Sequence, residues 1–230
     1  MGSAPDLILH HGQFTTLDWK NPTASAVAVE SGKFVHVGRD SEVLALAGAR
    51  TKVVDLAGKG ALPGLIDNHS HFIRGGLNFN LELRWDGVRS LADAMAMLSR
   101  QVAITPPPQW VRVVGGFTEH QFAEKRLPTI DEINAVAPDT PVFLLHLYDR
   151  ALLNGAALRA VGYTKDTPVP SGAEMVRDTA GNPTGLLVAK PSAAILYATL
   201  AKGPKLPFEY QLNSTRHFMR ELNRLGVPAQ

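Results

Sequence analysis

The sequence predicts an α/β protein with a strand-rich N-terminal part. Residues 6–56 hold short apolar runs separated by tight-turn sequences, a pattern typical of closely spaced strands. After residue 61, apolar strand-like runs alternate with helical patterns, which is typical of βαβ units. A chain of 230 residues, 45% hydrophobic and 19% charged, can bury one core and a small satellite domain.

The N-terminal part is expected to be a small β-sandwich over residues 1–61. The turn sequence at residues 30–33 carries a glycine suited to φ > 0 and predicts a hairpin. His10, His11 and His36 are expected to be ordinary polar residues without a ligand role. Strands are predicted at residues 7–9, 26–29, 34–37 and 53–56, with a short helix at 41–47.

Residues 62–230 alternate between strand and helix patterns. Ser90 and Thr129 are expected to cap helices, and residues 168–183 to form loops with a small hairpin. Strands are predicted at 110–114, 141–145 and 185–190. Helices are predicted at 90–102, 129–136, 150–161, 191–200 and 207–225.

Two histidines end the stretch at residues 61–72, which reads as a short apolar strand followed by Asp67. Side chains alternate faces along a strand, so His69 and His71 would point the same way. Two imidazoles at the carboxyl end of a strand suit a shared metal ion. The alternative is a polar loop after a strand, with two ordinary histidines.

The segment PGLIDNHSH at residues 63–71 resembles the PGxIDxHxH signature of the metal-dependent amidohydrolase superfamily. Further stretches resemble its YtcJ-like branch, amidohydrolase family 3: residues 115–117, 126–129, 138–142, 154–158 and 177–185. The resemblance implies a partial TIM-like (β/α) barrel at 62–230, with an insertion at about 78–185, preceded by the β-sandwich. A complete barrel takes about 250 residues, so the chain is expected to be the N-terminal part of a longer hydrolase.

The same resemblance implies hydrolysis of C–N bonds in small, non-peptide amides by a metal-activated water. It implies His69 and His71 as ligands of a divalent metal, with Zn²⁺ first and Fe²⁺ or Mn²⁺ also suited. The family's bridging carboxylate is often a carbamylated lysine. Lys190 ends an apolar strand and is the candidate for this catalytic and metal-bridging role. The alternative is a lysine whose stem covers apolar surface at a strand end.

Two other histidines, His120 and His146, follow strand-like segments and are expected to contact substrate, against an ordinary structural role. The chain departs from the family pattern at residues 117–120, where relatives tend to have Gly-Trp, and at Arg150, where they often have histidine. The remaining family ligands, two histidines and an aspartate, are expected beyond residue 230. The competing interpretation is a truncated, non-catalytic relative with a binding or regulatory role.

The resemblance implies a small-molecule substrate, and composition does not point to a nucleic acid or a membrane as partner. The net charge is +2 and basic residues do not cluster, so a nucleic-acid partner is not expected. Apolar runs stay well short of the ~20 residues of a membrane span. The chain has no cysteine, which fits a reducing compartment, and a cytoplasmic location is expected. Missing barrel strands would leave apolar edges exposed, which predicts self-association into a homo-oligomer.

Overall fold

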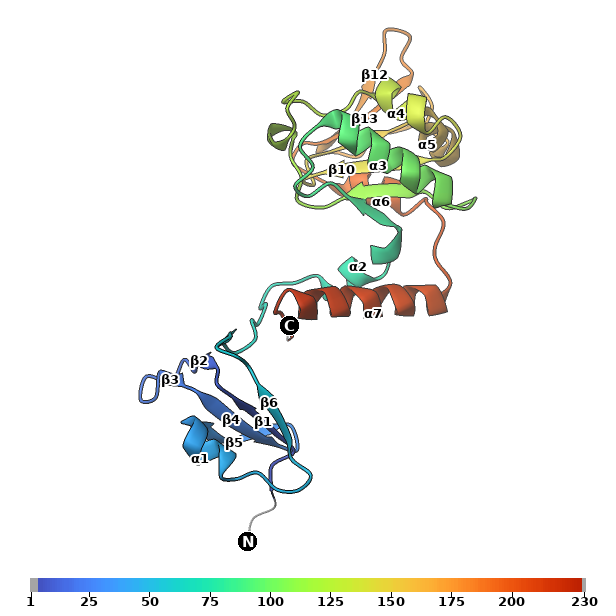
Figure 1. Ribbon diagram of the computed structural model, residues 1–230. Helices are drawn as coiled ribbons and strands as arrows, with labels where there is room; N and C mark the ends of the chain where they lie inside the picture. The colour runs from blue at the N-terminus through green and yellow to red at the C-terminus, as the bar shows by residue number, and fades with distance from the viewer. Residues whose placement is uncertain (1–3, 229–230) are drawn as a thin grey trace. The chain divides into compact units, whose positions relative to one another are not determined.

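The computed structural model describes residues 4–228, which form two compact units of mixed α/β structure (Figure 1). The first unit holds the residues up to Ser70 together with those from Leu222 onward. The second unit is His71–Glu221. The predicted domain boundary between residues 61 and 62 stays a prediction.

The first unit contains a four-stranded sheet and a three-stranded sheet. The larger has the order β5-β4-β1-β6, formed by β1 (Leu7–His10), β4 (Ala26–Glu30), β5 (Lys33–Gly38) and β6 (Lys52–Asp55). The smaller has the order β3-β2-β7, formed by β2 (Gln13–Thr15), β3 (Thr23–Ala24) and β7 (Gly60–Ala61). The predicted strands of the larger sheet are confirmed, whereas β2, β3 and β7 were not predicted.

Local sequence explains the first sheet well. In the hairpin between β4 and β5, Ser31 and Gly32 both have positive φ, 50° and 75°, as a tight two-residue turn requires. Helix α1 (Asp40–Leu44) buries Val43 against Ile8 and the alanines of β4. Strand β1 runs antiparallel to β4 and parallel to β6.

The second unit is built on a six-stranded sheet with the order β12-β13-β11-β10-β9-β8. Its strands are β8 (Glu82–Arg84), β9 (Val111–Val114), β10 (Val142–His146), β11 (Arg150–Leu153), β12 (Ala173–Arg177) and β13 (Pro183–Ala189). Strands β8, β9 and β10 are parallel, and the other pairs are antiparallel. The parallel strands therefore end at one common edge of the sheet.

Helices cover this sheet and fill the connections. Helix α3 lies across the strands in Figure 1. The helices of the unit are α2 (Phe72–Gly76), α3 (Leu91–Ile104), α4 (Ile130–Val136), α5 (Gly155–Val161) and α6 (Ala194–Leu200), with 3₁₀ turns η1 (Phe79–Leu81) and η2 (Glu119–Gln121). The long helix α7 is Phe208–Arg224. Within residues 4–228, we find no helix with the length and apolar character to cross a membrane.

Strand β10 forms the centre of the core because it is buried on both faces. Val142 and Leu144 pack into a cluster with residues of α3 and α4. Phe143 and Leu145 point to the opposite face and pack with residues of α5, α6 and β13. A strand buried on both faces reads as a continuous apolar run, which is why the sequence predicted β10 correctly.

One predicted strand is wrong. Residues 62–65 are not in a strand and Ile66 makes only an isolated bridge, with Leu65 and Ile66 56% and 76% exposed. An apolar run becomes a buried strand only when neighbouring strands satisfy its backbone. Here the Leu65 N–H donates to the Gly226 carbonyl, at 2.7 Å, so this backbone group is satisfied outside a sheet.

The helix predicted over residues 150–161 is only half right. Residues Arg150–Leu153 form β11, which pairs with β10 on one side and β13 on the other. Alanine and leucine favour a helix locally, but two ladder partners override that preference. The helix begins after Asn154, whose side chain accepts a hydrogen bond from the Ala157 N–H.

Helix α4 begins with a capping box that gives a testable pH dependence. Hydrogen bonds from Arg126 first, and from the Thr129 N–H, lower the pKa of Glu132 to about 2 from its usual 4.5. The folded protein therefore binds fewer protons here than the unfolded chain, so this contribution is complete above about pH 5 and lost toward pH 2.

We expect Glu132→Gln to lower the free energy of unfolding at pH 7 by about 1 kcal/mol, a modest value because the ion pair is partly exposed. The difference from wild type should shrink as the pH falls from 5 to 2, measured by urea unfolding. Asp131→Asn changes an exposed acid of the same helical turn and is the control. A difference that stays constant across this range would contradict the assigned pairing.

Candidate active site

The two signature histidines lie in an exposed turn between β7 and α2. The His69 N–H donates to Asp67 Oδ1 at 3.0 Å, and His71 occupies the residue before the first turn of α2. An aspartate that accepts a hydrogen bond from the N–H two residues later closes an Asx turn. Because the strand expected here is absent, alternation along a strand does not place the two imidazoles, and their shared metal stays a prediction.

Helix α2 follows His71 directly and is anchored on α7, which lies beside it (Figure 1). A Cβ at Gly76 would lie 2.9 Å from the side chain of Thr215, so the two helices approach closely only with glycine there. Buried Ser214 accepts a hydrogen bond from the Asn80 N–H, and His217 Nδ1 lies 2.6 Å from Asn80 Oδ1. These contacts fix the segment that follows His71 against α7.

Lys190 follows β13, which is an antiparallel strand paired with β11 and β12. Its side chain is 61% exposed and forms an ion pair with Glu174 of the neighbouring β12. The predicted strand is confirmed, but its end is not the end of a parallel strand such as β9 or β10. The predicted bridging role of Lys190 stays a prediction.

The donor chemistry of His69 and His71 suits a divalent metal, because neutral imidazole nitrogen is a common ligand of Zn²⁺ and Fe²⁺. Two ligands are half of a tetrahedral set. Within residues 4–228, the group of three histidine or carboxylate side chains with ligand atoms within 4.8 Å of one another lies elsewhere, at the end of β1. A metal site at His69 and His71 therefore stays a prediction.

A polar network lies at the carboxyl edge of the parallel strands. His146, at the end of β10, is 3% exposed. Its Nε2 lies 2.8 Å from Glu119 Oε2, and its Nδ1 lies 2.8 Å from Asp149 Oδ1. Arg150 donates to the second oxygen of Asp149, at 2.8 Å from Nη2. A buried imidazole with a carboxylate on each ring nitrogen has a fixed orientation.

The two carboxylates of the network carry negative charge. The Glu119 N–H, followed by the nearby His146 ring, lowers the pKa of the Glu119 carboxyl despite partial burial. Burial raises the pKa of Asp149, but hydrogen bonds from Arg150 and His146 outweigh it and leave this pKa below its usual value. The edge of the sheet thus presents fixed acceptors beside a paired histidine.

Sequence reasoning identified His146 but missed Glu119 and Asp149. The available signal was their position, since each carboxylate follows the carboxyl end of one of two consecutive parallel strands. His120 is exposed, and its carbonyl accepts a hydrogen bond from Lys125 Nζ at 2.6 Å. Substrate contact by His120 and His146 stays a prediction.

A cavity of about 590 Å³ lies in the second unit. Its first lining residue, Arg74, is three residues after His71 in the sequence. Arg74, Arg112 and Lys205 contribute cationic side chains, and the Arg74 guanidinium lies 4.2 Å from the centre of the Tyr197 ring. The lining residues are Arg74, Leu77, Asn78, Arg112, Tyr197, Leu200, Ala201, Gly203, Lys205, Leu206 and Gln211. Its size suits a small molecule, and its charge suits an electron-rich group.

Several named proteins are similar in sequence to this chain. N-substituted formamide deformylase of Arthrobacter pascens is 35% identical over 185 residues, covering 80% of this chain and 34% of that protein. YtcJ of Bacillus subtilis strain 168, named provisionally as an amidohydrolase, is 31% identical over 193 residues, covering 83% of this chain and 36% of that protein. The chain thus spans about a third of the length of these relatives.

A solved structure and a family pattern agree with these relatives. A crystal structure of a metal-dependent hydrolase from Pyrococcus horikoshii has a TM-score of 0.59 at 22% identity, over 97% of this chain and 42% of that chain, so the two share a fold. The sequence pattern of the amidohydrolase family matches residues 52–229, more than half of the chain and including the PGLIDNHSH segment. This chain belongs to the amidohydrolase family.

Proposed function

We propose that this chain is part of a metal-dependent hydrolase that cleaves a C–N bond in a small, non-peptide amide with water as the nucleophile. The observation that carries the proposal is the family match across residues 52–229, which includes both His69 and His71. The name of the Arthrobacter pascens relative supports an N-substituted formamide as the first substrate to test.

In this proposal His69 and His71 hold the metal through neutral imidazole nitrogens. Zn²⁺ is the first candidate, and Fe²⁺ and Mn²⁺ also suit these ligands. When bound, such an ion supplies a Lewis acid that polarises a carbonyl and lowers the pKa of water. Asp67 holds the turn that carries His69 through the 3.0 Å hydrogen bond. Lys190, as a carbamate, would give the bridging carboxylate and complete this half of the site.

The substrate side of the proposal rests on the polar network and the cavity. His146 is proposed to line the substrate pocket, and its buried ring, with both nitrogens paired, also holds Glu119 in place. His120 is exposed and lies outside the strands, and it is the histidine proposed to contact substrate directly. The cationic cavity, with Arg74 and Arg112, would take a carbonyl or carboxylate group of the substrate.

The larger context belongs to the same proposal. The barrel is proposed for residues 62–230, and the three parallel strands with α3 and α4 between them lie within its proposed insertion at about 78–185. The two sheets of the first unit suit a β-sandwich. A cytoplasmic location follows the cysteine-free composition, and self-association follows apolar residues exposed on β5, such as Phe34 and Val35.

The test is release of formate from an N-substituted formamide by a longer protein that contains this chain together with the remaining ligands, supplied in turn with Zn²⁺, Fe²⁺ or Mn²⁺. We expect release with at least one metal, and the rate should fall to that of the protein-free reaction in a His69→Ala/His71→Ala variant, which has lost both metal ligands. His36→Ala, which changes an exposed histidine of β5, is the control and should keep the full rate. Equal rates in wild type and the double variant would contradict the assignment. The absence of release with every metal from the longer protein would favour the binding or regulatory role.

A further inference from the structure

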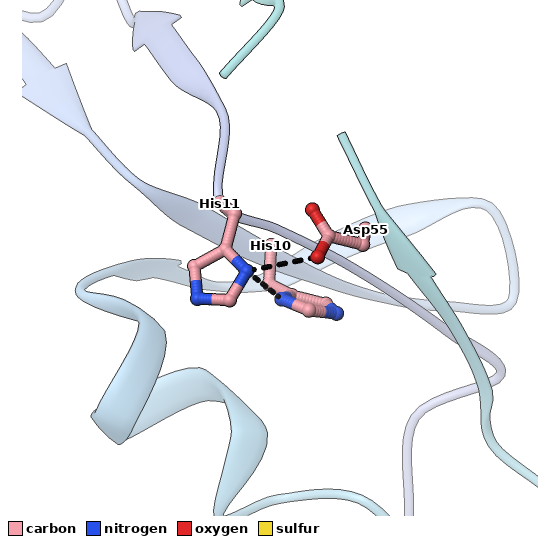
Figure 2. Close-up of side chains that lie close together, drawn as sticks. All are labelled: His10, His11 and Asp55. Carbon is pink, nitrogen blue, oxygen red and sulfur yellow. Dashed lines mark hydrogen bonds and ion pairs between the residues drawn. The ribbon is translucent and has the colours of Figure 1, made fainter. Parts of the chain in front are cut away.

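Three side chains of the kinds that can ligate a metal meet at one end of the first sheet, away from the signature histidines in the sequence. They are His10 at the end of β1, His11 directly after it, and Asp55 at the end of β6 (Figure 2). His10 Nδ1 lies 3.1 Å from His11 Nδ1, and His11 Nδ1 lies 3.0 Å from Asp55 Oδ2. All three ligand atoms lie within 4.8 Å of one another.

The backbone brings these residues together through strand register. Strands β1 and β6 are parallel, with His10 opposite Asp55. The Leu56 N–H donates to the His10 carbonyl at 2.8 Å, and the Gly58 N–H donates to the His11 carbonyl at 2.7 Å. The cluster therefore lies at paired strand ends, which fix the positions of its side chains more precisely than a flexible loop would.

His11 has a left-handed backbone conformation, with φ of 51°. This conformation costs roughly 1–2 kcal/mol in a residue with a Cβ. It reverses the usual alternation at the end of β1, so that successive residues His10 and His11 turn their rings to the same place. Figure 2 shows His11 Nδ1 joined by dashed lines to both His10 Nδ1 and Asp55.

Additional hydrogen bonds orient two of these side chains, Asp55 and His11. The Ala57 N–H donates to Asp55 Oδ1 at 2.7 Å, which leaves Oδ2 directed at His11. The His11 N–H donates to Asp40 Oδ1 at 2.7 Å, which fixes the backbone that carries the ring. Such outer hydrogen bonds are what hold histidine and carboxylate ligands in position around a metal.

The nitrogen and oxygen atoms that meet here are better placed to coordinate a cation than to form hydrogen bonds with one another. A neutral imidazole offers one proton at most, yet His11 Nδ1 faces both a carboxylate oxygen and a second imidazole nitrogen. A tetrahedral ion with ligand bonds of about 2.0–2.1 Å separates neighbouring ligand atoms by roughly 3.3 Å. The two distances of 3.0 Å and 3.1 Å are close to that spacing.

We propose that His10, His11 and Asp55 bind a divalent transition metal, with Zn²⁺ as the first candidate, at a site distinct from His69 and His71. Two imidazoles and one carboxylate fill three positions and leave the fourth to water, since the side chains of His11 and Asp55 are 57% and 54% exposed. The ion joins the end of β1 to the end of β6, so its binding stabilises the four-stranded sheet.

The experiment uses the full chain carrying His69→Ala/His71→Ala, so that the signature histidines are absent. Zn²⁺ is titrated by calorimetry, and the metal retained after gel filtration is counted. We expect about one equivalent of Zn²⁺ to bind. The further change His11→Asn should weaken binding at least about tenfold, because asparagine accepts the left-handed conformation but lacks the imidazole. His36→Ala changes an exposed histidine of the same sheet and should bind Zn²⁺ unchanged.

Asp55→Asn is the second variant, because its amide oxygen can still accept the hydrogen bond from Ala57. It should also weaken binding at least about tenfold, with a circular dichroism spectrum like that of the parent. A rise in melting temperature on adding Zn²⁺ should be seen in the parent and lost in both variants. The proposal is overturned if the parent binds no Zn²⁺, or if His11→Asn and Asp55→Asn bind it as tightly as the parent. Neither result bears on the signature histidines, which are absent from every protein in this series.

Discussion

Replacing Asn154 by alanine should lower the free energy of unfolding by about 4 kcal/mol, because one buried side chain satisfies four backbone groups. Asn154 Oδ1 accepts hydrogen bonds from the Val142 and Ala157 N–H groups, each at 2.9 Å. Its Nδ2 donates to the carbonyls of Ala137 at 2.6 Å and Thr140 at 2.9 Å. Alanine would leave these groups buried without partners, and each such group costs roughly 1–3 kcal/mol.

Urea unfolding followed by circular dichroism checks this value. Asn134→Ala is the matched control, because the Asn134 side chain accepts one hydrogen bond, from the Gly155 N–H at 2.8 Å, at the start of the same helix. The control should lose about 1 kcal/mol. If both variants lost similar amounts, Asn154 would not be the link between β10, α5 and the chain after α4.

The His146→Ala variant should lose about 3 kcal/mol of stability, through a cavity and a broken polar network. The imidazole is 3% exposed and contacts Phe117 edge-to-face, with ring centres 5.9 Å apart. Its removal leaves Glu119 and Asp149 without the group between them. Two negative carboxylates at one edge of the sheet would then face each other without an intervening donor.

The pKa values of these carboxylates separate this account from simple loss of packing. Nuclear magnetic resonance titration should show the pKa of Asp149 rising in His146→Ala, with Glu119 rising less because its own N–H is the larger cause of its low pKa. Both carboxyls have folded pKa values below their unfolded ones, so they stabilise the fold above the unfolded pKa and stop doing so as the pH falls. The variant should therefore lose less stability on acidification than wild type. His146→Phe keeps most of the volume, and unchanged carboxylate pKa values in that variant would refute the assigned network.

Elements whose signal is local could be predicted from the sequence. The run Val142–Leu145 predicted β10 because a strand buried on both faces has apolar residues at every position. Ser90 and Thr129 predicted the starts of α3 and α4, and their side chains accept the expected hydrogen bonds from Asp93 and Glu132 N–H groups. The glycine turn at Ser31 and Gly32 predicted the first hairpin.

Features that depend on distant partners could not be predicted in this way. Residues Arg150–Leu153 look helical alone, and become β11 because β10 and β13 pair with them. Residues 62–66 look like a strand alone, yet remain outside the sheets of the described chain. The candidate sites follow the same rule. Glu119 reaches His146 across 27 positions, and Asp55 reaches His11 across 44, through strand register that a local pattern does not contain.

The metal content of the purified chain tests the central claim most directly. The measurement uses a chain in which His11→Asn and Asp55→Asn have removed the second cluster, loaded with Zn²⁺ and desalted, and read by plasma mass spectrometry. The account predicts about one equivalent of bound Zn²⁺, lost when His69 and His71 are both changed to alanine. A metal content that is equal with and without these two histidines would contradict the proposal that His69 and His71 bind the metal.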